Sequence, residues 1–574
     1  MRNKKKKELG AFYTPSHLAE LITYNTIDLF LIQRVNYFTN STYTSPQEII
    51  AEGKETNIQK INDVLRTLCA LDGATGDGQF LISVFKRIKE IRLLISERYK
   101  KKESNQNEIE LEILNSNIFG MEIDSDSVLQ CHKNLLKNIK KENIPEAQRI
   151  LKMNIIRGNF LKSKHENWHN DSIQDQGFDI IIGNPPWGGK LTKDQKDDYY
   201  NLFALKCPKR NLNTSSLFVY QATKLLNPNL GILSFLLPKN IVRSNQYTFL
   251  REFILKQYKI INSNFYGLFK DVTQEFISLI AQRTKEVPKD HIVIIDEKIY
   301  IPQTAYLTNP DYIFTRTYDP HSQELLQLIQ KESIPLSHFL TIYRGEELSK
   351  RGSVMFCPNC EKWVQLSSRK ENIICPQCLK NLDKVKLKRM NLIQKEKDLD
   401  HNQPILTGDD FDHYKINAHH YIDSTINYRS KKGPKIYCSP KLVVQKIKRF
   451  PCAAFDSNGF WTTQNVYNLI LTPEYEDKSD ILFYILAVLN SSLYRWYYEV
   501  QFNLESNYTN AISIHNLRRL LIRKPDFSNP TFIQIIDKAR SIAKLNLKIN
   551  SAIIEEINNL ILKYYNCENM LQPV

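Results

Sequence analysis

The chain has 574 residues, 42% of them hydrophobic, and a formal net charge of +16 at pH 7. This length predicts more than one domain with large cores. The excess of Lys and Arg indicates a polyanionic partner. No apolar run approaches the ~20 residues that span a bilayer, so we expect nucleic acid and exclude a membrane as the partner.

The chain's start and its cysteines indicate the compartment. The N-terminus is basic but lacks the apolar segment of a signal peptide, so we expect a cytoplasmic protein of a bacterium or an archaeon. Four of the ten cysteines form two Cys-X-X-Cys pairs and six are scattered. This is no disulfide framework, and it fits a reducing compartment.

Residues 1–304 alternate strand-like and helix-like segments, the pattern of a mostly parallel sheet covered by helices. The predicted strands are 68–71, 118–123, 180–182 and 231–237, and the predicted helices are 80–95, one that ends near Leu135, and 217–226. The polar stretch 100–112 is interpreted as a surface loop or a frayed helix end. We therefore predict an α/β, Rossmann-like first domain.

Residues 305–574 have a different pattern, with short strands, many tyrosines and dense lysines. A cysteine-rich insert at about 353–382 interrupts this segment. Residues 542–565 carry an apolar stripe at helical spacing, which predicts a closing helix packed on its own domain. We predict a mixed α+β second domain.

A glycine-rich loop, Asp72-Gly-Ala-Thr-Gly-Asp-Gly78, follows the first predicted strand. Its glycines let the backbone approach a ligand closely. The loop lacks the Gly-Lys-Ser/Thr signature of a triphosphate site, and its leading acidic residue suits an amino cation. Glu122 ends the second strand, where an acidic side chain typically accepts hydrogen bonds from ribose hydroxyls. An amino cation plus a ribose indicates S-adenosylmethionine; solvated strand ends are the alternative.

The strand at 180–182 continues into Asn184-Pro-Pro-Trp187. The two prolines fix the backbone and remove two N–H donors, which leaves the Asn184 side chain and the Pro185 carbonyl as acceptors beside an indole ring. Such a loop suits a planar group with an amino substituent, as on a base turned out of its stack. An ordinary turn is the alternative, since Asn-Pro dipeptides commonly initiate turns.

Five motifs in order resemble the gamma-class adenine-N6 DNA methyltransferases of restriction–modification systems, the TaqI-like group. They are Gly10-Ala-Phe-Tyr-Thr-Pro15, Asp72 to Gly78, Gly120-Met-Glu-Ile-Asp124, Arg157-Gly-Asn-Phe-Leu161 and Asn184 to Trp187. The resemblance implies that the first domain is an S-adenosylmethionine-dependent methyltransferase and the second a DNA target-recognition domain. It covers the first domain well and the second more loosely.

The resemblance also implies roles for individual residues. The cofactor-binding positions correspond to Tyr13, Thr14, Pro15, Asp72, Ala74, Gly76, Glu122, Ile123 and Asn159. Asn159 stands where the family usually has an aspartate that contacts the cofactor's adenine amine, and Gly73 replaces the usual proline. Trp187 and Phe269 are expected to pack the flipped base.

The implied chemistry is direct methyl transfer to the adenine amine, with Asn184, Pro185, Pro186 and Trp187 as the catalytic residues. Hydrogen bonds from both amine protons to the Asn184 side chain and the Pro185 carbonyl favour a pyramidal nitrogen with a free lone pair. Alignment of that nitrogen with the methyl group supplies much of the remaining acceleration. No covalent enzyme intermediate is required.

Two Cys-X-X-Cys pairs lie 14 residues apart, and they comprise Cys357, Cys360, Cys375 and Cys378. Four thiolates at this spacing satisfy a tetrahedral zinc ion and leave no open position. The sequence therefore predicts a structural zinc ribbon. A redox role is the weaker alternative, because matched pairs in a reducing compartment favour a metal.

Between Asp423 and Asp456 there is no acidic residue. The basic side chains of this segment include Lys431, Lys432, Lys435, Lys441, Lys446, Lys448 and Arg449. The segment resembles the target-recognition domain of TaqI-like enzymes, as does Leu486 to Ser492, so we expect contacts with the phosphates of double-stranded DNA. A solvated face is the alternative.

These observations together predict a monomeric, site-specific adenine-N6 methyltransferase of a type II restriction–modification system. A cognate restriction endonuclease is expected in the same system without a stable complex. Three alternatives stay open: a methyltransferase for RNA or protein glutamine, a fused restriction–methylation enzyme, and an inactive DNA-binding relative. Few residues precede the first motif, which argues against an N-terminal nuclease.

Overall fold

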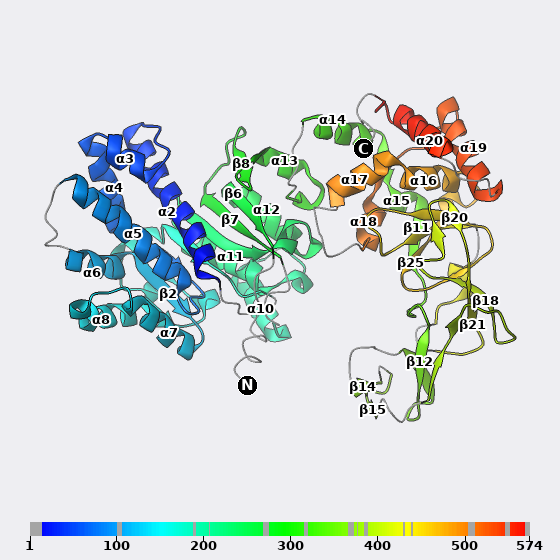
Figure 1. The fold of residues 1–574 in the computed structure, drawn as a ribbon, viewed down its shortest axis with the longest axis horizontal. Coiled ribbons are helices and arrows are strands. Elements are labelled where there is room, and N and C mark those ends of the chain that lie inside the picture. The colour runs from blue at the N-terminus through cyan, green and yellow to red at the C-terminus, as the bar shows by residue number, and fades with distance from the viewer. Residues whose placement is uncertain are drawn as a thin grey trace. The chain divides into compact units, whose positions relative to one another are not determined.

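The computed structural model has two compact units, Met1–Thr317 and Tyr318–Val574 (Figure 1). It describes residues 14–99, 106–187, 191–205, 207–267, 275–314, 320–365, 372–375, 377–383, 388–428, 431–437, 440–502, 511–545 and 551–568. A search of these residues finds no helix with the length and apolar character of a membrane span.

The first unit ends later than the predicted boundary at residue 304. Arg251 donates two hydrogen bonds to the carbonyl of Asp311, at 3.0 and 2.9 Å, and the Phe314 amide donates to the carbonyl of Val242. These contacts attach residues 305–314 to the first unit.

The first unit contains a nine-stranded sheet in the order β3-β2-β1-β4-β5-β7-β6-β8-β9. The strands are β1 (Ala70–Asp72), β2 (Ile118–Glu122), β3 (Ile155–Arg157), β4 (Ile180–Gly183), β5 (Ile232–Pro238), β6 (Tyr258–Tyr266), β7 (Phe276–Arg283), β8 (Ile292–Ile295) and β9 (Ile299–Pro302). The first five strands pair in parallel, and β7 runs antiparallel between β5 and β6. The predicted α/β class with a mostly parallel sheet is confirmed.

The helices of the first unit connect these strands. They are α2 (Ser16–Thr39), α3 (Pro46–Glu52), α4 (Glu55–Thr67), α5 (Gln79–Arg98), α6 (Gln106–Ser116), α7 (Ser125–Leu136), α8 (Ile144–Asn154), α9 (Asp171–Gln176), α10 (Lys193–Leu202), α11 (Thr214–Leu225), α12 (Thr248–Gln257) and α13 (Gln303–Thr308). One core cluster joins α2, α4 and α5 to the buried faces of β1, β2, β4 and β5. The strands and helices predicted before residue 240 are present.

The prediction for 100–112 is wrong for the part of it that the structure describes, because α6 spans Gln106–Ser116. Glu110 is fully buried and pairs with Lys89 at 2.6 Å, and Glu112 pairs with Arg92. Both cations lie on α5. Basic partners in the preceding helix therefore hold a polar segment that the sequence alone presents as solvated.

The second unit combines small sheets with a helical cluster. Its strands are β10 (Ser333–Pro335), β11 (Leu340–Arg344), β12 (Ser353–Cys357), β13 (Lys362–Gln365), β14 (Asn372–Ile374), β15 (Asn381–Asp383), β16 (Arg389–Asn391), β17 (Ile393–Gln394), β18 (His401–Leu406), β19 (Phe411–Asp412), β20 (Lys415–Ile416), β21 (His420–Asp423), β22 (Lys441–Gln445), β23 (Ala453–Asp456), β24 (Trp461–Thr462), β25 (Val466–Leu471) and β26 (Leu521–Arg523). Two four-stranded sheets, β11-β25-β22-β23 and β17-β21-β18-β24, form its centre.

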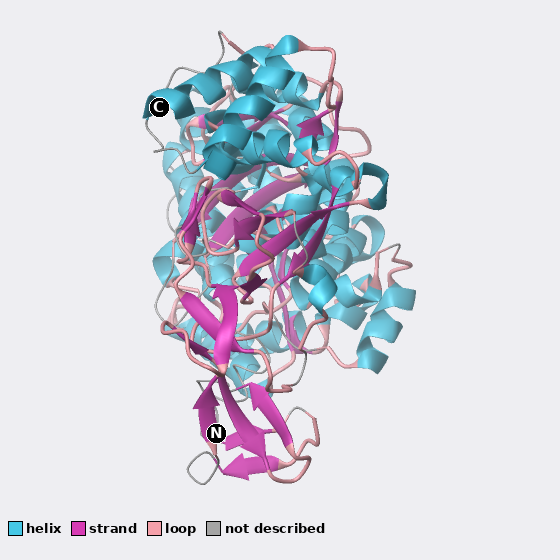
Figure 2. Cartoon of the chain, turned by 90° about the vertical axis from the view of Figure 1, so that its right-hand side faces the viewer, coloured by secondary structure: helices cyan, strands magenta, loops and turns pink. Residues whose placement is uncertain are grey.

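The helices of the second unit are α14 (Pro320–Gln330), α15 (Leu336–Phe339), α16 (Asp480–Asn490), α17 (Ser492–Phe502), α18 (Ile514–Arg519), α19 (Pro530–Leu545) and α20 (Ser551–Tyr564). The predicted closing helix is a pair, α19 and α20, whose apolar residues join the core cluster around α16. Within this unit the helices gather at one end and the cysteine-bearing hairpins lie at the other (Figures 1 and 2).

Gly183 occupies a tightly packed position at the end of β4. Its φ is +152°, and a Cβ added there would lie 2.6 Å from the Asp72 Oδ1 atom. We predict that Gly183→Ala lowers the free energy of unfolding by about 1–3 kcal/mol, because a non-glycine residue is strained in this conformation. Chemical denaturation measures this change. Gly267→Ala is the control, since a Cβ there meets nothing within 4 Å, and equal stability of the two variants would contradict the prediction.

Candidate functional site

Four predicted motifs meet at one edge of the first unit's sheet. The order β3-β2-β1-β4 places the ends of four parallel strands next to one another, and these strands lead to Asn159, Glu122, Asp72 and Asn184. Strand order reverses between β1 and β4, and ligands of open α/β sheets bind at the carboxyl ends of strands at such a point. The edge is therefore the candidate ligand site.

Asp72 lies at the centre of this edge. Its side chain is buried, and Oδ1 accepts a hydrogen bond of 3.0 Å from the Ala74 amide. Burial raises the pKa of the carboxyl to about 7; the Ala74 amide opposes this rise, and the nearby carboxylates of Glu122 and Asp77 add to it. A cationic ligand group would favour the ionised form of Asp72.

Glu122 connects the glycine-rich loop to β2. Its Oε2 accepts from the Gly76 amide at 3.0 Å, and its Oε1 accepts from the amides of Ile123 and Asp124 at 2.8 and 3.0 Å. Carboxylate oxygens have additional lone pairs that can accept from ribose hydroxyls. The neighbouring Ile123 side chain is 55% exposed. It offers an apolar surface on which an adenine ring could pack.

Phe160 explains the departure from the family pattern at Gly73. A Cβ at Gly73 would lie 2.5 Å from the Phe160 ring, so a proline does not fit while the ring is there. The neighbouring Asn159 accepts from the Leu161 amide through Oδ1, and its Nδ2 donates to the Tyr199 hydroxyl, both at 3.1 Å. The Asn159 carbonyl oxygen thus already accepts one hydrogen bond and has one remaining lone pair.

Asn184 lies against the N-terminal motif. Its Nδ2 donates a hydrogen bond of 3.1 Å to the Thr14 hydroxyl, which joins residues 170 positions apart in the sequence. Thr14 is buried, and Pro15 is the N-cap residue of α2. Asn184 directly follows β4, which pairs with β1, the strand that ends at Asp72.

Trp187 differs from the sequence-based expectation. Its side chain is 5% exposed, its Nε1 donates to the Leu236 carbonyl at 3.3 Å, and its ring lies 6.0 Å from that of Phe276. The expectation of an open stacking surface is wrong for this conformation, because core packing covers the indole. Tyr13 and Phe269 lie outside the described residues.

The four paired cysteines of the second unit come together. The Sγ atoms of Cys357 and Cys378 are 3.7 Å apart, and those of Cys360 and Cys375 are 3.8 Å apart. Zn–S bonds of ~2.3 Å in a tetrahedron put sulfur atoms about 3.8 Å apart. Cys357 and Cys360 lie where β12 turns into β13, and Cys375 and Cys378 lie between β14 and β15, so the close sulfur atoms come from two different hairpins. The geometry is compatible with a tetrahedral metal ion.

Most of the basic side chains at 431–449 reach solvent, but Lys441 does not. Lys441 is 0% exposed, and its ammonium pairs with the fully buried Asp456 at 2.5 Å. It also donates to two backbone carbonyls at 3.1 Å. The expectation that Lys441 contacts DNA is wrong, because this side chain is part of the core.

The other basic side chains are at least partly exposed. The Lys431 ammonium donates to the Ser424 and Ile426 carbonyls, and that of Lys432 donates to the Arg344 carbonyl. Arg449 pairs with Glu499, Lys435 is exposed, and Lys446 and Lys448 are half-buried. Burial lowers the pKa of Lys446, and the positive charge of Arg344 at the end of β11 lowers it further. Arg344 therefore belongs to the same group of cations. It lies outside the basic segment, so no local pattern in the sequence identifies it.

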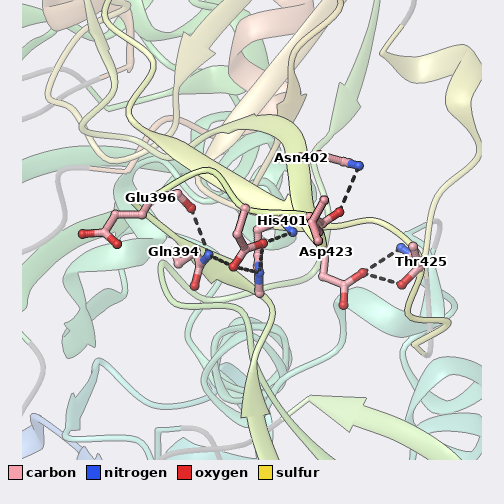
Figure 3. Close-up of polar contacts among 8 residues, drawn as sticks. Gln394, Glu396, His401, Asn402, Asp423 and Thr425 are labelled. Atoms are coloured by element: carbon pink, nitrogen blue, oxygen red, sulfur yellow. Dashed lines mark hydrogen bonds and ion pairs between the residues drawn. The ribbon is translucent and has the colours of Figure 1, made fainter.

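The basic segment starts from a rigid turn. The Asp423 carboxylate accepts from the Thr425 amide and hydroxyl at 2.9 and 2.5 Å (Figure 3). On the adjacent strand, the amide and Nδ1 of His401 contact Asp398 at 2.6 and 3.0 Å, and Gln394 bonds to the Glu396 carbonyl. Side chains of β17, β18 and β21 thus fix both turns.

Two family models match the chain. Residues 116–269 match the Eco57I restriction-modification methylase, and residues 403–522 match the TaqI-like C-terminal specificity domain.

Among curated relatives, the type II methyltransferase M.VspI of Vibrio sp. (strain 343) is 26% identical over 217 residues, which covers 37% of this chain and 48% of the relative. The putative type II restriction enzyme and methyltransferase RM.MjaORFECS2P of Methanocaldococcus jannaschii is 26% identical over 203 residues, 32% of this chain and 17% of the relative. The chain covers less than half the length of either.

Solved structures share the fold. The Type IIL restriction-modification enzyme MmeI, in complex with DNA, gives a TM-score of 0.60 at 14% identity, with 100% of this chain and 78% of that chain covered. A nuclease-deletion mutant of the Type ISP enzyme LlaGI, in complex with a DNA substrate mimic, gives 0.52 at 12% identity, with 94% and 47% covered. At these identities the likeness concerns the fold alone.

The raised pKa of Asp72 predicts a pH-dependent affinity for S-adenosylmethionine. An ammonium group binds the carboxylate form, so the affinity levels off as the pH rises past the pKa of about 7 and falls as the pH drops below it. The decrease approaches about tenfold per pH unit, because one proton must be released on binding. Calorimetric titrations across a range of about pH 5.5 to 8.5 measure it. Asp72→Asn should bind weakly with a flat profile, and a flat profile in the unmodified protein would contradict the prediction.

Lys441 and Lys435 should respond differently to substitution. Lys441→Met leaves a buried carboxylate without its cation, so we expect a loss of about 3–5 kcal/mol in the free energy of unfolding. Lys435→Ala should leave the stability unchanged and reduce the salt dependence of DNA affinity by about one phosphate contact. Denaturation curves and fluorescence anisotropy at several salt concentrations measure the two effects. The reverse pattern would contradict the assignment of both residues.

Proposed function

We propose that this chain, which carries an Eco57I restriction-modification methylase domain and a TaqI-like specificity domain, transfers the methyl group of S-adenosylmethionine to the N6 amine of an adenine in double-stranded DNA. The observation that carries the proposal is the Asn184 amide at the β1/β4 strand ends, beside the loop of Asp72 and Glu122. The sheet edge thereby joins a cofactor loop to an acceptor for an amino group.

The residues at the edge fit the proposed cofactor. Asp72 offers a buried carboxylate for the ammonium group, Glu122 offers acceptors for the ribose hydroxyls, and exposed Ile123 offers a surface for the adenine ring. The remaining contacts are proposed for Thr14, Pro15, Ala74, Gly76 and Asn159. S-adenosylmethionine supplies an electrophilic methyl group when bound, and the chain's own residues supply its position.

In the proposed mechanism, the Asn184 Oδ1 and the Pro185 carbonyl accept hydrogen bonds from the two protons of the target amine. These acceptors stabilise the positive charge that develops on the nitrogen during transfer. Pro186 keeps the loop extended. Trp187, anchored to Leu236 and Phe276, braces the loop from the core side. The released proton passes to solvent.

The second unit is proposed to hold the duplex. Exposed and half-buried cations around Lys435, Lys446, Lys448 and Arg344 suit contacts with phosphates, which position DNA without specifying sequence. We further propose that the chain acts as a monomer within a type II system and does not form a stable complex with its endonuclease. The Cys357–Cys378 group is proposed to hold a structural zinc ion, as its sulfur spacing supports.

Asn184→Ala tests the proposal. Nucleoside mass spectrometry on mixed-sequence DNA with methyl-labelled S-adenosylmethionine should detect N6-methyladenine for the unmodified chain. The variant should lose at least about 10²-fold in rate, while its calorimetric affinity for the cofactor persists. Asn229→Ala, an exposed asparagine before β5 at the opposite edge of the sheet, is the matched control.

Each outcome of this experiment decides between functions. Label on the cytosine amine keeps the mechanism and changes the base, whereas label on RNA or protein instead of DNA overturns the substrate. Asn184→Ala at the rate of the unmodified chain overturns the catalytic assignment. Cofactor binding without any transfer identifies an inactive DNA-binding relative.

A further inference from the structure

A second group of metal-ligand side chains lies in the second unit, apart from the paired cysteines. It consists of Asp412 and His413, at the turn between β19 and β20, and Cys452, next to β23. Cys452 lies 40 positions after Asp412 and 39 after His413. In the sequence Cys452 is one of the scattered cysteines, so the group appears only in the fold.

The three ligand atoms are close together. Cys452 Sγ lies 3.2 Å from Asp412 Oδ1 and 3.8 Å from His413 Nδ1, and His413 Nδ1 lies 2.8 Å from Asp412 Oδ1. A tetrahedral zinc ion, with bonds of ~2.0–2.3 Å, holds such atoms about 3.3–3.6 Å apart. Each observed distance is within ~0.5 Å of that geometry.

Contacts with two neighbouring strands hold the turn in place. The Tyr414 backbone amide donates to the Ala453 carbonyl at 2.8 Å, and the side-chain amide of Gln445 donates to the Phe411 carbonyl. Tyr414 adopts a φ of +66° within the turn. Contacts that do not involve the three ligand side chains therefore bring these ligands together.

The two ligands on the hairpin are more exposed than the cysteine. Cys452 is fully buried, whereas the side chains of Asp412 and His413 are 69% and 38% exposed. Asp412 and Lys448 also line a cavity of about 450 Å³. A metal ion held by these three residues would thus keep a fourth position open to water or to an oxygen ligand that enters from the cavity.

We propose that Asp412, His413 and Cys452 form a second zinc site in this chain. Thiolate and imidazole together favour zinc over magnesium or calcium, which prefer oxygen ligands. Zinc replaces the thiol proton of Cys452, which leaves to solvent, and replaces the hydrogen bond from that thiol to Asp412. Lys448 acts on both Asp412 and Cys452 and offsets part of their negative charge. The site fastens the β19–β20 hairpin to the strand end before β23.

Metal content of the full-length chain tests this proposal. The protein is equilibrated with zinc, desalted and measured by plasma mass spectrometry. We expect two zinc ions per chain, falling to one in His413→Gln and in Cys452→Ala, and unchanged in Cys567→Ala, which removes a buried thiol elsewhere. His413→Gln changes a half-exposed side chain, so it remains informative if Cys452→Ala does not fold.

The variants also separate this site from the paired cysteines. A double variant, Cys360→Ala with Cys378→Ala, should lose the other ion and keep this one. In the cobalt-substituted protein, five thiolates bind metal: the four paired cysteines and Cys452. The thiolate-to-metal absorption should therefore drop by about one fifth in Cys452→Ala, which removes one of the five. Zinc content and absorption that stay unchanged in both His413→Gln and Cys452→Ala overturn the proposal, whatever the paired cysteines bind.

Discussion

The first unit depends on the close approach of Gly183, the last residue of β4, to the carboxylate of Asp72. Gly183 permits this approach, because any side chain there would collide with Oδ1. The same approach removes Asp72 from water and raises the pKa of its carboxyl. The carboxylate is then poised for a cation, and Asn184 lies one residue beyond the glycine. Steric constraint and electrostatics at this edge therefore have one origin, the adjacency of β1 and β4.

The sequence predicts the first unit well because its signals are local. Apolar runs such as Ile180 to Ile182 and glycine-rich turns identify parallel strands without any partner information. The contacts between distant segments are not local signals. Thr14 meets Asn184 across 170 positions, and Trp187 turns into the core against Phe276. Those contacts decide which side chains are exposed, so the motif positions were predictable and the orientation of the indole was not.

Charge patterns in the second unit were harder to interpret for the same reason. Lys441 looks like its exposed neighbours in the sequence, yet Asp456 neutralises it inside the β22–β23 pair. Glu346, fully buried, accepts from the hydroxyls of Tyr428 and Tyr437 within the same unit. A charged side chain is buried only where partners satisfy it, and those partners come from other strands. Arg344 is exposed and lies outside the basic segment, and the fold brings its charge close to Lys446.

Packing accommodates one departure from the family pattern, the glycine at position 73. Gly73 stands where a proline is usual, and the space is filled by the Phe160 ring, which directly follows Asn159. Phe160 in turn packs on Phe218 of α11 at 4.9 Å, so it belongs to the core of the unit. The buried Asp72 and the hydrogen-bonded Glu122 lie at the same edge of the sheet, and on them rests the proposal of a ligand site there.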